Sequence, residues 1–113
     1  MYLASSLDSV CRVFDAIDLC SMHTIHDWGC GDGRVVALAA AAFGARAVGW
    51  ERDQQLLAVG QELQSEVSEE RITLIKGSFL SVTLLPADRA TPDVVFYFDG
   101  GSLSLIHISE PTR

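Results

Sequence analysis

The chain has 113 residues, the length of one domain, and its 49% hydrophobic and 20% charged residues are typical of a globular rather than a disordered protein. Its formal net charge of −7 excludes a protein that holds the phosphate backbone of nucleic acids through a basic surface. The longest strongly apolar stretch, 35–43, is too short to span a bilayer, so we expect no transmembrane segment.

The cysteines and the N-terminus indicate the compartment. Cys11, Cys20 and Cys30 form no CxxC pair, and their odd number argues against a disulfide framework and for a reducing compartment. The N-terminus has no basic region like that of a signal peptide. The cysteines and histidines are not clustered with the spacing of a zinc site. We therefore expect an intracellular protein, cytoplasmic or mitochondrial and not secreted, without a metal centre.

The spacing of apolar residues predicts an N-terminal helix, followed by strands that alternate with helices. In the first segment apolar side chains recur at helical spacing, and Ser5 with Asp8 fits a capping box. Gly44 is expected to end the second helix, and Asp53 to cap the third. The predicted helices cover 5–20, 34–43 and 53–67, and the predicted strands cover 24–27, 46–51, 71–75 and 94–98.

The alternation of strands and helices predicts the topology. Strands that are separated by helices run parallel, because a parallel pair needs a crossover connection of a dozen or more residues. Right-handed crossovers wind such a chain into a sheet that helices cover on both faces. The sequence therefore predicts the α/β class, with a Rossmann-like, doubly wound and mostly parallel sheet.

A glycine-rich turn lies between the first predicted strand and the following helix. Gly29, Gly31 and Gly33 stand at alternate positions, where the lack of a Cβ lets the backbone turn sharply and approach a ligand. The next helix would offer free N–H groups and the positive end of its dipole to an anionic group. Glu51 ends the second predicted strand, 22 residues after Gly29, where a carboxylate can accept hydrogen bonds from a ribose diol.

The residues around this turn discriminate between nucleotide ligands. The third glycine of a dinucleotide fingerprint would fall at position 34, which is Arg34, and the GK[ST] sequence of a P-loop is absent. Asp27 and Asp32 disfavour a pyrophosphate, but they suit a ligand that carries an ammonium group and a sulfonium. S-adenosyl-L-methionine (SAM) carries both groups, together with a carboxylate and a ribose.

Two stretches of the sequence carry a resemblance to a known family. The pattern Asp27-x-Gly29-x-Gly31-x-Gly33, with the run ARAVGWERD at 45–53, resembles motif I and its sequel in class I (seven-stranded) SAM-dependent methyltransferases. The runs GDGRVV at 31–36 and GARAVG at 44–49 look more narrowly like the small protein-lysine methyltransferases of the ATP-synthase c-subunit type. The resemblance covers roughly residues 2–99 and is strongest over 27–51.

The resemblance implies a cofactor, a set of site residues and a reaction. The cofactor is SAM, and the implied binding residues are Asp27, Gly29, Cys30, Gly31, Asp32, Gly33, Glu51, Ser78 and Phe79. Asp27 and the turn would hold the methionine moiety, Glu51 the ribose, and Ser78 and Phe79 would border the adenine. Asp99 would face the acceptor, and it is the candidate that takes a proton from an attacking amine. The implied partner is a protein whose lysine side chain displaces the sulfonium methyl group directly.

Three positions of the implied site call for other interpretations. Trp28 stands where the family has a small aliphatic residue, and we interpret it as a packing residue rather than one that reads the acceptor. Cys30 fits the turn as a small residue, because no base is near in sequence to activate its thiol. Ser78 replaces a frequent acidic residue at the adenine edge, which removes one hydrogen bond to the exocyclic amine.

The end of the sequence departs from the family. By resemblance the strand order is 3-2-1-4, with the fourth strand in the middle of a seven-stranded sheet, but about four strands are present here. The fourth strand would then be a bare apolar edge, prone to aggregation. Residues 102–113 begin with a strand-like alternation and do not resemble the family. We interpret 1–101 as the SAM-binding half of a C-terminally truncated methyltransferase, and 102–113 as a non-family tail that an artefact of transcript assembly would explain.

Two other functions stay open. An intact cofactor half beside a missing acceptor half would also fit an inactive fragment or a module that binds SAM or another nucleoside without catalysis. A fragment of an NAD-type dehydrogenase is the other alternative, and Arg34 argues against it.

Overall fold

The computed structural model describes residues 7–67, 70–77, 92–99 and 102–107. The elements are α1 (Leu7–Ala16), β1 (Thr24–Trp28), α2 (Arg34–Phe43), β2 (Arg46–Glu51), α3 (Gln54–Val67), β3 (Ile72–Lys76), β4 (Val94–Asp99) and β5 (Ser102–His107). The strands form one sheet in the order β3-β2-β1-β4-β5. The first four run parallel to one another, which confirms the predicted α/β fold and the order 3-2-1-4.

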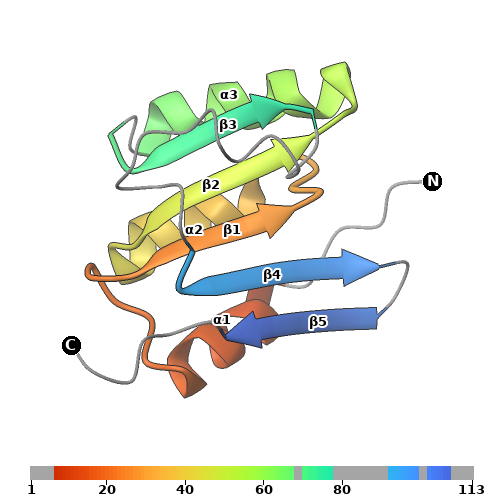
Figure 1. The fold of residues 1–113 in the computed structure, drawn as a ribbon. Helices are drawn as coiled ribbons and strands as arrows, with labels where there is room; N and C mark the ends of the chain where they lie inside the picture. The colour runs from red at the N-terminus through yellow and green to blue at the C-terminus, as the bar shows by residue number, and fades with distance from the viewer. Residues whose placement is uncertain (1–6, 68–69, 78–91, 100–101, 108–113) are drawn as a thin grey trace.

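The three described helices cover one face of this sheet, as Figure 1 shows. The strand order reverses between β3 and β4, which lie at opposite sides of the β2–β1 pair. The segment that connects them, 78–91, lies outside the described residues, so the expected covering of the second face stays a prediction. None of the described helices is long and apolar enough to cross a membrane.

Helix α1 is shorter than the sequence predicts. It ends at Ala16 rather than near Cys20, because Asp18 takes a left-handed backbone conformation with φ of 55°. The N–H of Leu19 then bonds back to the carbonyl of Phe14 at 3.0 Å, the closure of a helix C-terminus. The helical spacing of apolar residues continues beyond Ala16, so the pattern does not reveal that the helix ends there.

An aromatic cluster attaches α1 to the rest of the core. The ring of Phe14 meets Phe43 of α2 edge-on at 5.6 Å and Phe96 of β4 at 6.1 Å. Phe14 and Phe96 are both almost fully buried. Through these contacts α1 packs against α2 and β4, while strand pairing aligns the carboxyl ends of β4 and β1.

The ends of α2 and α3 have the predicted caps. Gly44 adopts φ of 72° after the last turn of α2, and its N–H reaches back to the carbonyl of Ala40 at 3.1 Å. Oδ1 of Asp53 accepts from the backbone N–H groups of Gln55 and Leu56 at 2.9 and 3.2 Å, as an N-cap does. These local signals set where the chain leaves and enters the sheet.

The sequence interpretation of the fourth strand as a bare edge is wrong. Strand β5 pairs antiparallel with β4 over its whole length, from Val94 opposite His107 to Asp99 opposite Ser102. Figure 1 shows β5 as the outermost strand, beyond β4. The strand-like alternation of this segment is therefore realised, and it supplies main-chain partners to the exposed side of β4.

Candidate functional site

The glycine turn has the backbone geometry that its sequence demands. Gly29, Gly31 and Gly33 adopt φ of 84°, 58° and 82°, values that residues with a Cβ rarely adopt. The N–H groups of Gly29 and Cys30 both donate to the carbonyl of Trp50, at 2.8 and 2.9 Å. The turn after β1 is therefore hydrogen-bonded to the carboxyl end of β2. These two N–H groups are not free to bind an anion.

Glu51 is the centre of a second set of backbone contacts. Its Oε1 accepts from the N–H of Gly31 at 2.7 Å, and its Oε2 accepts from the N–H groups of Arg52 and Asp53 at 3.0 and 2.9 Å. A carboxylate offers about four acceptor positions, of which three are used here. Glu51 can therefore accept one ribose hydroxyl as it stands, and a second only if one backbone donor is released.

Close packing fixes the depth of the turn. A Cβ on Gly33 would lie 3.1 Å from the Cα of Gly60, so the start of α2 touches α3 backbone to backbone. A Cβ on Gly49 would lie 2.7 Å from Sγ of Cys30. Cys30 is buried, and burial together with the nearby carboxylate of Asp27 raises the pKa of its thiol. A neutral, enclosed thiol packs and does not act as a nucleophile.

Asp27 is a buried acid directly below the turn. Its side chain is 3% exposed, and burial, followed by the charge of Glu51, raises its pKa to about 8. Near neutral pH this carboxyl group is therefore protonated in most molecules. A positively charged ligand at the carboxyl end of β1 would favour its ionised form.

Asp32 occupies the N-terminus of α2 itself. Its carboxylate accepts from the backbone N–H of Arg34 at 3.2 Å and forms an ion pair with the Arg34 guanidinium at 2.6 Å. A protein carboxylate thus sits where a dinucleotide pyrophosphate would bind. Asp32 borders a different hollow, between α1 and α3 with Leu7 and Val59, and the structure does not bring it beside Glu51.

A cavity of about 300 Å³ lies at the carboxyl ends of the parallel strands, where open α/β sheets bind ligands. It is lined by Trp28, Gly29, Trp50, Glu51, Arg52, Gly77 and Tyr97. It thus collects the ends of β1, β2, β3 and β4 around one space. Within the described ranges no group of three or more His, Cys, Asp or Glu could hold a metal ion.

No protein-family model matches the chain, and no curated protein matches it. Solved structures do match. An RNA methyltransferase from Salinibacter ruber, solved with S-adenosyl-L-homocysteine (SAH), has a TM-score of 0.64 and 28% identity, and the match covers 67% of this chain and 50% of that protein's chain. A precorrin-6y C5,15-methyltransferase from Geobacter metallireducens has a TM-score of 0.69 and 22% identity, covering 88% and 52%. A protein-L-isoaspartate O-methyltransferase has a TM-score of 0.67 and 18% identity, covering 86% and 31%.

The chain has the fold of the SAM-dependent methyltransferases. It spans about half or less of the length of these solved methyltransferases. By their names they act on an RNA, a precorrin and a protein, so this fold carries several kinds of methyl acceptor.

The methyltransferase fold brings together some of the predicted site residues. Gly29 and Glu51 line the cavity, and Gly31 is bonded to Glu51. Ser78 and Phe79 lie outside the described residues, directly after Gly77. The backbone of Asp99 ends β4, and its side chain is outside the described part of the structure. The roles of all these residues stay predictions.

Sequence reasoning missed four lining residues and interpreted a fifth differently. Trp50, Arg52, Gly77 and Tyr97 line the cavity without having been candidates, and Trp28, interpreted as packing, lines it as well. Each of them lies within two residues of the carboxyl end of a parallel strand. The signal that could have found them is therefore their place in the topology rather than a motif.

Proposed function

We propose that residues 1–101 are the cofactor-binding half of a SAM-dependent methyltransferase. The observation that carries the proposal is the bond from the N–H of Gly31 to Glu51, beside the cavity at the carboxyl end of the sheet. It joins the glycine turn to the one acceptor group that the sequence assigns to a ribose. The match to a methyltransferase solved with SAH at 28% identity supports the same ligand.

The residues of the site fit the parts of SAM. Glu51 accepts a ribose hydroxyl, and the positive end of the ligand is favoured by Asp27, whose carboxyl group ionises when a cation is near. Gly29, at the surface of the turn, lets the ligand approach the backbone without a side chain in between. The bound cofactor supplies an activated methyl group, and the protein supplies its alignment with an acceptor.

For the acceptor we propose the side-chain amine of a protein lysine. The support is the resemblance of the runs at 31–36 and 44–49, together with the net charge of −7, which suits a basic protein segment. A lysine attacks only after it loses a proton, and Asp99 at the end of β4 is the residue that we propose takes it.

A second candidate is a nucleoside-binding chain without catalysis. The bond between Gly31 and Glu51 and the cavity beside it would serve such a chain equally, because they would hold a nucleoside without themselves moving a methyl group. An NAD-type dehydrogenase is less compatible with the structure, because the Asp32–Arg34 ion pair covers the helix end that would receive a pyrophosphate.

Calorimetric titration of the chain with SAH tests the proposal. Wild type should bind saturably, and Glu51→Ala should weaken binding about tenfold or more. Glu66→Ala, which removes a carboxylate from an exposed position of α3 outside the cavity, should leave the affinity unchanged. A chain that melts cooperatively but binds no SAH, or that exchanges SAH for NADH, contradicts the proposal. Transfer of labelled methyl groups to a lysine-containing protein would then separate catalysis from binding alone.

A further inference from the structure

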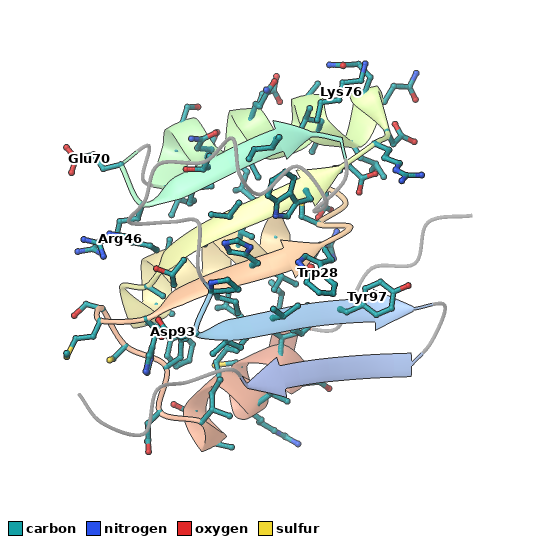
Figure 2. The ribbon with its side chains drawn as sticks, in the orientation of Figure 1. Trp28, Arg46, Glu70, Lys76, Asp93 and Tyr97 are labelled. Atoms are coloured by element: carbon teal, nitrogen blue, oxygen red, sulfur yellow. The ribbon has the colours of Figure 1, made fainter. Side chains whose placement is uncertain are left out.

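Two aromatic side chains stand together at the mouth of the site. Trp28 ends β1 and is the register partner of Tyr97 in β4. Both line the 300 Å³ cavity together with Glu51. Figure 2 shows the two labelled side chains at the same end of the sheet. Tyr97 is 38% exposed and Trp28 is partly exposed, so neither is fully enclosed by the described protein.

The position of these rings is not that of core residues. Successive strand residues point to opposite faces, so Trp28 lies on the face opposite Asp27 and Ile25. Ile25 belongs to the core under the helices, and neither Trp28 nor Tyr97 is part of that core. Large aromatic side chains usually bury their rings to stabilise the fold. Here two of them line a cavity, beside the place where a ligand would bind.

The charge around these rings favours a cation. The faces of tryptophan and tyrosine rings carry negative electrostatic potential and attract cations within about 6 Å of the ring centre. The carboxylate of Glu51 lies in the same cavity. The cationic side chain that lines the cavity, Arg52, follows β2, on the other side of β1 from Tyr97.

The strand order assigns an end of the ligand to the rings. With the ribose at Glu51 on β2, a ligand that extends across β1 toward β4 passes Trp28 and then Tyr97. We propose that Trp28 and Tyr97 bind the sulfonium end of SAM through their ring faces, so that the site prefers the charged methyl donor to the neutral product SAH. This inference rests on the proposed function and names which state of the cofactor the site selects.

The test compares charged and neutral ligands on matched variants of the full chain. Dissociation constants are measured for SAM, for SAH, and for sinefungin, in which a carbon bearing an ammonium replaces the sulfonium. Wild type should bind SAM and sinefungin about five times more tightly than SAH. Trp28→Leu and Tyr97→Leu should each reduce this preference by about twofold to fivefold. Trp28→Phe and Tyr97→Phe, which keep an aromatic face, should retain most of it.

The outcomes separate this inference from the proposed function. A wild-type chain that binds SAH and SAM equally overturns the inference, and no variant is needed for that result. Leucine variants that weaken all three ligands by the same factor also overturn it, because the rings would then contribute only packing. If wild type melts cooperatively and binds none of the three ligands, the proposed function fails and the inference fails with it.

Discussion

The backbone N–H of Gly31 donates to Oε1 of Glu51 at 2.7 Å, a bond between the turn after β1 and the carboxyl end of β2. The two parts of the candidate site, 20 residues apart in the chain, are thus held together before any ligand is bound. Preorganisation of this kind lowers the ordering that a ligand would have to impose. The same bond makes Glu51 important for stability as well as for binding, and the two roles can be separated.

Replacement of Glu51 should lower both stability and affinity. Glu51→Ala removes the acceptor of three backbone N–H groups, and we expect the free energy of unfolding to fall by about 1–2 kcal/mol, with SAH binding weakened about tenfold or more. Asp53→Ala removes the cap of α3 and should lower stability by about 1 kcal/mol while SAH binding is kept. Urea denaturation and calorimetry measure the two effects. Equal loss of affinity in both variants would show that Glu51 acts only through stability.

The contact between Gly33 and Gly60 predicts a difference between two glycine substitutions. Both Gly33 and Gly44 have positive φ, so alanine at either site should lower stability by about 1 kcal/mol through the backbone alone. At Gly33 the new Cβ also meets the Cα of Gly60 at 3.1 Å, whereas at Gly44 it meets Ser21 at an ordinary 3.6 Å. Gly33→Ala should therefore lower the free energy of unfolding by about 1 kcal/mol more than Gly44→Ala does. Equal denaturation midpoints for the two variants would contradict the tight contact.

Asp27 predicts how stability depends on pH. Its pKa in the folded chain is about 8, above the ordinary value of 3.8, so the folded state keeps a proton that the unfolded chain releases. This contribution to stability is complete below about pH 4 and is lost as pH rises toward about pH 8. Thermal melts should show the wild-type Tm falling across this range relative to Asp27→Asn, which cannot ionise. Asp8→Asn, a change at an exposed position of α1, should show the same pH dependence as wild type. If Tm changes with pH in the same way for wild type and Asp27→Asn, the raised pKa of Asp27 is refuted.

The pairing of β5 with β4 predicts a role for the end of the chain. Removal of residues 102–113 deletes β5 and exposes the hydrogen-bonding edge of β4, whose first three residues are apolar. We expect this shortened chain to melt at a lower temperature and to form aggregates in size-exclusion chromatography with light scattering. Removal of 108–113 alone leaves β5 intact and should preserve the Tm and the elution volume of the full chain. A chain of 101 residues that elutes without aggregates and is as stable as the full chain would show that β5 pairing is dispensable.

The sequence was most informative where structure depends on a few neighbouring residues. The glycine turn, the Gly44 stop and the Asp53 cap are local, because each depends on backbone conformation or on bonds within one helical turn. The early end of α1 at Ala16 was missed because Asp18, a residue with no strong signal, takes the left-handed conformation. The partner of β5 was missed because strand pairing is non-local, and the alternation of a strand does not say which edge it joins.

By itself, the sequence determined the alternation of helices and parallel strands, the left-handed glycine turn and the acidic end of β2, because periodicity and turn chemistry are written in consecutive residues. Only the tertiary structure decided which side chains share a space. It placed Trp28 beside Tyr97, bonded Glu51 to Gly31, and turned Asp32 to Arg34 and away from the cavity. These relationships depend on strand order and close packing, and they bring together residues that are distant in the chain.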